Sequence, residues 1–201
     1  MLKHDHLQSL PLPQQYLKEL GPTYRFADRA HEGQIRKLTG EDYVVHPVAV
    51  TGLTWLANKD ITALQGALLH DTVEDTDVTN EDIRRRFGRE VAMNVWGVTK
   101  DSSIKGWRPK NEAWLHRFGG QAPIASVDIG TADKVDNLGG TIDRFRERGP
   151  VIWEQFTGTP EDYLWWYTSV LAIAKRRAPN SPLTEILGDK VDTLYVDVFK
   201  R

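Results

Sequence analysis

The chain is organised around Ala67-Leu68-Leu69-His70-Asp71-Thr72-Val73-Glu74-Asp75-Thr76. This stretch carries an imidazole and three carboxylates directly behind an apolar run that we expect to enter a core. If residues 61–75 form one helix, an advance of about 100° per residue puts these ionisable groups on one face. Carboxylates three or four residues apart on a helix repel each other, and unpaired charges are costly in a core. The stretch therefore predicts a bound cation, and its histidine and carboxylate donors suit Mn, Fe or Zn better than Mg or Ca.

The composition is that of a soluble globular protein. The chain has 201 residues, of which 40% are hydrophobic and 27% charged, and its formal net charge is −2. This charge gives no overall basic field of the kind that binds nucleic acid. Because the chain has no cysteine, disulfides and thiolate metal sites are excluded. No apolar run is long enough to cross a membrane or to act as an export signal, so we expect a cytoplasmic protein that binds neither nucleic acid nor membrane.

Helix start and stop signals recur along the chain, and no segment shows a convincing period-two strand pattern. Asp60 is a predicted N-cap for the helix that carries the central stretch, and residues 79–82 and 159–162 resemble helix starts. Glycines predict helix ends at Gly88 and at Gly139-Gly140. Together these signals predict an all-α fold, a compact bundle of roughly eight to ten helices.

The N-terminal segment is interrupted by prolines and a glycine. Residues 1–22 are therefore expected to form an arm or a short helix before the core. The first core helix is predicted to begin at Thr23. Residues 23–201 show no further boundary and are expected to form a single domain.

Several polar segments offer groups for binding a phosphorylated ligand. Arg36 and Lys37 lie in a predicted loop and would suit phosphate, and the planar arginine fork can also stack on a base. His46 precedes Pro47, which is well placed at the first position of a helix. The start of a helix is a rigid place from which to direct an imidazole.

Two later segments offer further candidates. Residues 101–109 are polar and broken by glycine and proline, which predicts a mobile loop, with Arg108 and Lys110 in or beside it. Asp133 and Asn137 lie one turn apart on another predicted helix. They would form a polar face on an otherwise apolar helix.

Most of the candidate residues, though not Arg108 and Lys110, belong to motifs that follow one another in order at plausible spacing. The motifs are Ala30-His31-x-Gly33-Gln34-x-Arg36-Lys37-x-x-Gly40-x-x-Tyr43-x-x-His46-Pro47, the stretch 67–76, Phe87-Gly88, Val98-Thr99-Lys100 and Ala132-Asp133-Lys134-x-x-Asn137-Leu138. In this pattern the chain resembles the HD hydrolase domain of the RelA/SpoT homologues. In size it resembles their stand-alone members, the small alarmone hydrolases.

The resemblance implies hydrolysis of the 3′-pyrophosphate of guanosine tetra- or pentaphosphate with one Mn²⁺ per chain. The implied metal ligands are His46, His70, Asp71 and Asp133. The choice of His46 over His31 comes from the resemblance, because spacing alone leaves both open. Glu74 and Asp75 match the family's catalytic pair. One would activate the attacking water, and the other would help to protonate the leaving oxygen or hold the hydrated metal; the sequence does not divide these roles.

A small-molecule nucleotide is the partner that the resemblance implies. The candidate substrate-binding residues are Arg36, Lys37, Asn137, Tyr163, Arg108 and Lys110. The first two would contact the nucleotide, Asn137 the ribose or base, Tyr163 the base, and the last two the pyrophosphate. The sequence leaves the oligomeric state open, and Fe and Zn remain alternatives to Mn.

The chain departs from the family pattern at Gly130, Asp136 and Gly139, where many members carry Lys, His and Arg. Because these changes remove positive charge beside a polyanionic substrate, a second substrate class stays open: another phosphorylated nucleotide, such as NADPH losing its 2′-phosphate. A catalytically silent nucleotide sensor is a third hypothesis. The Glu74-Asp75 pair argues against the sensor, since a module that only binds needs no acid/base pair.

Overall fold

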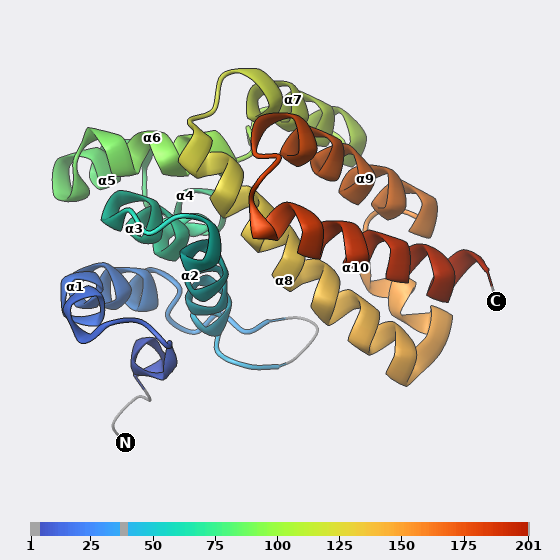
Figure 1. The fold of residues 1–201 in the computed structure, drawn as a ribbon, viewed down its shortest axis with the longest axis horizontal. Helices are drawn as coiled ribbons and strands as arrows, with labels where there is room; N and C mark the ends of the chain where they lie inside the picture. The colour runs from blue at the N-terminus through green and yellow to red at the C-terminus, as the bar shows by residue number, and fades with distance from the viewer. Residues whose placement is uncertain (1–4, 37–39, 201) are drawn as a thin grey trace.

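The computed structural model describes residues 5–36 and 40–200, which form α-helices and short 3-10 helices joined by loops (Figure 1). In chain order these are η1 (His6–Ser9), α1 (Gln14–Ala30), α2 (Val45–Ala57), α3 (Ile61–Leu69), α4 (Thr72–Asp75), α5 (Asn80–Phe87), α6 (Arg89–Val98), α7 (Trp107–Gly120), α8 (Ile124–Arg148), η2 (Gly149–Gln155), α9 (Pro160–Arg177) and α10 (Pro182–Phe199). Within the described ranges, pairing of extended backbone is limited to an isolated bridge between Ile35 and Asp42. The expected all-α fold is confirmed.

Helix α8 is the element on which the others assemble. It packs against α2, α3, α6, α9 and α10 and crosses the middle of the molecule in Figure 1. The helix end predicted at Gly139-Gly140 is wrong, because α8 continues to Arg148 and ends at Gly149, whose φ is 68°. Burial of Leu138 and Ile142 on either side of the glycine pair outweighs the cost of about 1 kcal/mol that each glycine adds within a helix.

Helix α1 begins before the predicted start at Thr23 and runs through Pro22. Four leucines upstream of that start are buried in one apolar cluster with side chains of α2 and α3: Leu7, Leu12, Leu17 and Leu20. Residues 14–22 are therefore part of the first core helix and not an arm or short helix before it, while residues 1–4 lie outside the described ranges. A proline within a helix costs about 3 kcal/mol, and the burial of this leucine face offsets that cost.

The central stretch is not one helix, contrary to the expectation for residues 61–75. Helix α3 stops before His70, and α4 begins after Asp71. The His70 side chain contributes to this break, because its Nδ1 donates to the Ala67 carbonyl at 2.8 Å and so satisfies one of the last carbonyls of α3. The two-residue link directs the His-Asp pair toward the junction of α3 with α2 and α8.

The predicted helix caps are confirmed. An Asp60 oxygen accepts a hydrogen bond from the backbone N–H of Thr62 at 2.7 Å. Capping boxes at Thr79 and Thr159 begin α5 and α9, and Gly88, with a φ of 91°, ends α5. Each cap depends on residues within three positions of it, so the sequence alone was enough to predict it.

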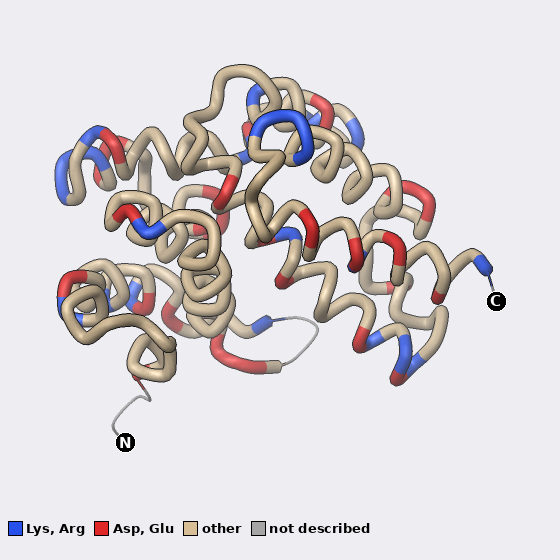
Figure 2. The backbone as a smooth tube through the Cα atoms, viewed as in Figure 1, with Lys and Arg blue, Asp and Glu red and all other residues tan. Residues whose placement is uncertain are grey.

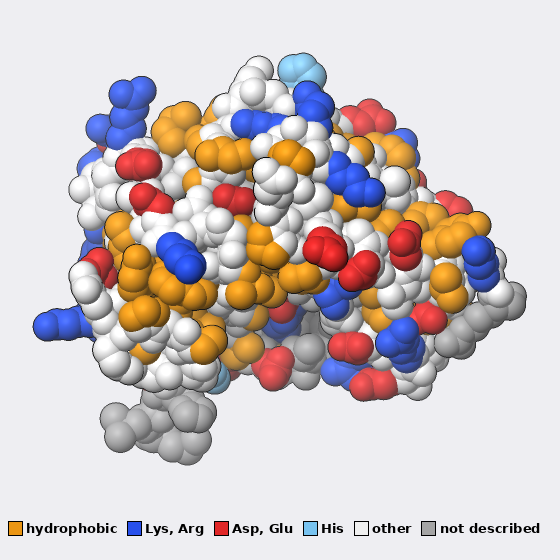
Figure 3. Space-filling view, viewed as in Figure 1, with side chains coloured by type: hydrophobic (Ala, Val, Ile, Leu, Met, Phe, Trp, Pro, Cys, Tyr) orange, Lys and Arg blue, Asp and Glu red, His pale blue; other side chains and the backbone are white. Residues whose placement is uncertain are grey.

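No helix within the described ranges is long and apolar enough to cross a membrane. Figure 2 shows Lys and Arg interspersed with Asp and Glu along the chain. On the face drawn in Figure 3, groups of apolar side chains are separated by charged ones. Both views agree with a formal net charge close to zero.

Gly130 on α8 faces a packed aromatic ring. A Cβ atom at this position would lie 2.6 Å from Cε2 of Phe118, whose fully buried ring stacks on Trp114. We expect Gly130→Ala to lower the free energy of unfolding by about 1–3 kcal/mol, because the ring must shift. Urea unfolding measures the change.

Gly140→Ala in the same helix is the matched control. No atom lies within 4 Å of a Cβ added there, so alanine should leave the stability unchanged or raise it by up to about 1 kcal/mol. If Gly130→Ala were as stable as the wild type, the ring would not constrain this position.

Candidate metal centre and active site

Three separate segments bring two imidazoles and two carboxylates together. His46 lies at the start of α2, His70 and Asp71 link α3 to α4, and Asp133 lies within α8. The His46 Nε2 atom is 3.4 Å from Asp71 Oδ2 and 3.2 Å from Asp133 Oδ1. The His70 Nε2 atom is 3.1 Å and 3.8 Å from the same two oxygens. The structure thus brings the four predicted ligands into one cluster.

The donor atoms fit a divalent metal ion. Nδ1 of His70 donates to a backbone carbonyl and Nδ1 of His46 lies 2.7 Å from an Asp136 oxygen, so both Nε2 atoms are left to offer lone pairs. His70 Nε2 is buried and makes no aligned hydrogen bond, although Asp71 lies near it. Ligand atoms about 2.1 Å from a metal are roughly 3.0–3.5 Å apart, close to most of the observed separations. His46, His70 and Asp71 can together hold a metal ion, and Asp133 lies beside them.

Ion pairs hold this cluster in the metal-free protein. Burial lowers the pKa of His46, but hydrogen bonds with aspartates outweigh burial and raise the pKa well above its ordinary value. Burial raises the pKa of Asp71, but the charge of His70 and the close approach of both imidazoles outweigh it and hold the pKa well below its ordinary value. Because only neutral imidazole binds a metal, metal binding has to displace protons here.

Glu74 and Asp75 lie beside the cluster, and each is held by a different neighbour. A Glu74 oxygen accepts a hydrogen bond from the backbone N–H of Lys100 at 3.0 Å. An Asp75 oxygen lies 3.0 Å from the Tyr43 hydroxyl, which is also 2.7 Å from Asp71. Burial, followed by the charge of Asp71, raises the pKa of Asp75. Tyr43 therefore connects a predicted ligand to a predicted catalytic residue.

These groups line a cavity of about 590 Å³. Its walls include Lys100, Lys134 and Asn137, and the same three residues also line an adjoining pocket of about 200 Å³. The smaller pocket adds aromatic rings, among them Tyr163 and Trp166. A charged cavity next to an aromatic pocket suits a phosphorylated ligand that carries a planar ring.

Three of the predicted substrate-binding residues lie at these cavities. Arg36 and Asn137 line the larger one, and Asn137 and Tyr163 line the smaller one. The Arg36 guanidinium also lies 3.0 Å from Asp136. Lys37 falls outside the described residues. That these side chains contact a nucleotide stays a prediction.

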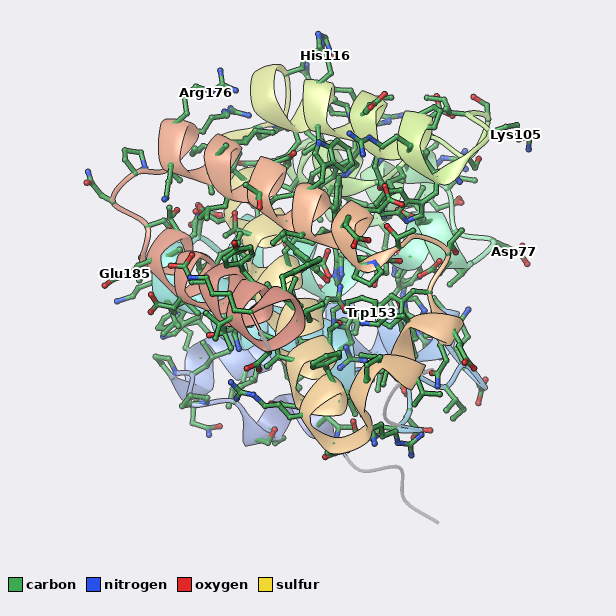
Figure 4. All side chains as sticks on the ribbon, turned by 90° about the vertical axis from the view of Figure 1, so that its right-hand side faces the viewer. Asp77, Lys105, His116, Trp153, Arg176 and Glu185 are labelled. Atoms are coloured by element: carbon green, nitrogen blue, oxygen red, sulfur yellow. The ribbon has the colours of Figure 1, made fainter. Side chains whose placement is uncertain are left out.

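Arg108 and Lys110 are not among the residues that line either cavity. The Arg108 side chain pairs with Glu112 at 2.9 Å and lies over the Trp165 ring, 3.3 Å from its centroid. Figure 4 shows Lys105, from the segment just before α7, pointing away from the body of the protein. The structure does not bring the cations of this segment to the cluster.

The sequence interpretation gave no binding or catalytic role to four residues of the site: Tyr43, Lys100, Lys134 and Asp136. Lys134 is only 7% exposed, and its ammonium group bonds Asp133 and faces the Trp166 ring. In the sequence, nearness to a predicted metal ligand was the signal that could have pointed to these residues. Lys134 directly follows Asp133, and Tyr43 precedes His46 by three residues. Proximity alone did not show which of these side chains turn inward.

A model of the HD domain family matches residues 23–123. The chain belongs to the HD domain family. The match includes three of the predicted metal ligands and both predicted catalytic residues, and it ends before Asp133. The contribution of α8 to the cluster therefore rests on the geometry.

Relatives of this HD domain protein include much longer chains. It is 44% identical over 110 residues to a guanosine-3′,5′-bis(diphosphate) 3′-pyrophosphohydrolase of Vibrio cholerae, and the match covers 52% of this chain. It is 43% identical over 107 residues to the bifunctional (p)ppGpp synthase/hydrolase SpoT of Escherichia coli, covering 53% of this chain. The chain matches 15% of the length of each relative.

Solved structures share the helical bundle. A metazoan orthologue of SpoT that hydrolyses ppGpp superposes with a TM-score of 0.67 and 23% identity, covering 93% of this chain and 97% of that one. The protein lmo0812 of Listeria monocytogenes superposes with a TM-score of 0.66 and 24% identity, covering 78% and 99% of the two chains. These likenesses confirm the expected HD-domain fold.

The ion pairs of the metal-free cluster predict how pH changes the stability gained from a metal. The raised pKa of His46 stabilises the metal-free protein below the ordinary value of 6.5, and this contribution is lost as the pH rises through the higher folded value. Asp71, with its lowered pKa, stays charged throughout this range. Because Mn²⁺ competes with the imidazole protons, it should raise Tm more at about pH 8 than at about pH 6.

Thermal melts of EDTA-treated and Mn²⁺-loaded protein at the two pH values measure this difference. The metal excess must be equal in all samples, since stabilisation depends on free ligand concentration. An equal or smaller gain in Tm at the higher pH would contradict the assignment of the two histidines as ligands.

Proposed function

We propose that this protein is a metal-dependent hydrolase that removes the 3′-pyrophosphate of guanosine tetra- or pentaphosphate. The observation that carries the proposal is the cluster of two imidazoles and two carboxylates beside Glu74 and Asp75, at a cavity that cations also line. The Vibrio cholerae and Escherichia coli relatives carry this reaction in their names, which supports the choice of substrate.

The metal in this proposal is one Mn²⁺ per chain, held by His46, His70, Asp71 and Asp133. Two nitrogen and two oxygen donors suit Mn, and Fe and Zn take similar sets. When bound, a divalent ion lowers the pKa of a water molecule and neutralises phosphate charge. We propose Mn²⁺ in preference to a harder ion such as Mg²⁺, because Mg²⁺ prefers oxygen ligands and two of the ligands here are the buried imidazoles of His46 and His70.

Glu74 and Asp75 handle protons in this reaction. One accepts a proton from the water that attacks the phosphorus next to the ribose 3′-oxygen, and the other delivers a proton to that oxygen as its bond to phosphorus breaks. The products are pyrophosphate and GDP or GTP. Lys100 and Tyr43 hold the two carboxylates in place through the hydrogen bonds already described.

The cavity contains cations although Gly130 and Gly139 supply none. Arg36, Lys100 and Lys134 line its walls, where they can bind phosphate groups. Asn137 and Tyr163 lie in the adjoining pocket, which we assign to the ribose and the base. This arrangement of cations and aromatic rings supports a phosphorylated nucleotide as the ligand.

Product analysis tests the proposed function. We expect Mn²⁺-loaded protein to convert ppGpp to GDP and pppGpp to GTP, each with release of pyrophosphate. Glu74→Gln should abolish turnover while keeping about one bound metal per chain, because Glu74 is assigned to proton transfer and is not one of the four proposed metal ligands. Chromatography of the nucleotides and metal analysis of the same samples give both readouts.

NADPH serves as the competing substrate in the same assay. Release of orthophosphate from NADPH alone would replace the proposal with a nucleotide 2′-phosphatase. Binding of one metal without turnover of any of the three substrates would contradict both activities.

A further inference from the structure

Asp136 contacts two functional residues through one oxygen. It lies one turn after Asp133 on α8, and its Oδ2 accepts hydrogen bonds from His46 Nδ1 at 2.7 Å and from Arg36 Nη2 at 3.0 Å. His46 is only 2% exposed. Solvent therefore cannot readily replace the carboxylate as the partner of its Nδ1 atom.

This contact sets which nitrogen of His46 faces the cluster. In a neutral imidazole, an Nδ1–H that donates to a carboxylate leaves Nε2 without a proton. Nε2 is the atom that lies 3.2 Å from Asp133 and 3.4 Å from Asp71. A neutral imidazole without such an acceptor can carry its hydrogen on either nitrogen, so Asp136 prepares His46 to act as a ligand.

Arg36 compensates the charge of Asp136 and is in turn held by it. Its guanidinium also approaches Asn137 at 3.4 Å, and its side chain lines the larger cavity. Asp136 therefore adds a carboxylate near the cluster without adding net negative charge, which would repel a phosphorylated ligand. The same pairing holds the arginine beside the space that such a ligand would occupy.

We propose that Asp136 is a positioning residue that orients His46 for metal binding and links it to Arg36, so that metal affinity and nucleotide affinity depend on the same carboxylate. A histidine at this position would have only one acceptor nitrogen when neutral. It could not accept hydrogen bonds from both partners. The metal part of the inference stands on geometry alone, and the nucleotide part rests on the proposed function.

Metal affinity tests the first part without an activity assay. Calorimetric titration of Mn²⁺ into metal-stripped protein should show about a 10- to 100-fold loss of affinity in Asp136→Asn and Asp136→Ala. Asp143→Asn is the matched control, because Asp143 is an exposed aspartate on the same helix, and it should bind Mn²⁺ as the wild type does. Circular-dichroism melts identify the variants that fold.

Asp136→Asn decides the test if Asp136→Ala does not fold, since it keeps the shape of the side chain. Folded Asp136→Asn protein that binds Mn²⁺ within about twofold of the wild type would overturn the proposal, because the expected loss is at least about tenfold.

A double-mutant cycle on the KM for ppGpp at saturating Mn²⁺ tests the second part. Arg36→Ala should raise KM about 10-fold, because a charge-assisted contact to the nucleotide is lost. Asp136→Asn should raise KM as well, and the double variant should show less than the product of the two effects, since both changes break the same pair. Multiplicative effects would refute the link. A wild-type protein that does not hydrolyse ppGpp would refute the proposed function and the nucleotide part with it, and would leave the metal part standing on the calorimetry.

Discussion

The structure depends on a buried polar cluster at the junction of α2, the α3–α4 link and α8. Ionisable groups that are largely excluded from water must satisfy one another or a metal ion, because an unpaired charge in a core is costly. This requirement joins segments that are far apart in sequence, such as His46 and Asp136, which are separated by 90 residues. The break after α3 and the unbroken course of α8 both serve to present side chains to that junction.

A second layer of side chains orients the first. Tyr43 lies between Asp71 and Asp75, Lys100 holds Glu74, and Asp136 holds His46. Most of these neighbours also line the cavity, so the groups that orient the site are the groups that a nucleotide would meet. A site arranged in this way needs little reorganisation when its ligand arrives, which is the usual basis of electrostatic catalysis.

The all-α fold and its helix caps could be predicted from the sequence because their signals are local, whereas the extent of some helices and the contacts between distant segments required information that no local pattern contains. Caps at Asp60, Thr79 and Thr159 depend on residues three or fewer positions away, and the structure has them all. The end predicted at Gly139-Gly140 failed because packing on both sides of the pair outweighs its low helix propensity. Arg108 was predicted to contact phosphate, but its side chain pairs with Glu112 and lies over the Trp165 ring, and it is not among the residues that line the two cavities. From the sequence, Asp136 was interpreted as a loss of positive charge. In the structure, its carboxylate accepts hydrogen bonds from His46 and Arg36.

The central claim is that two histidines and two aspartates from three segments bind one metal ion. Pulsed electron paramagnetic resonance of the Mn²⁺-loaded protein tests it most directly, because ¹⁴N nuclei bound to the ion modulate the electron spin echo. The account predicts coupling to two imidazole nitrogens in the wild type and to one in His46→Ala or His70→Ala that still binds Mn²⁺. A wild-type spectrum without ¹⁴N modulation, from protein with one Mn²⁺ bound, would contradict the account.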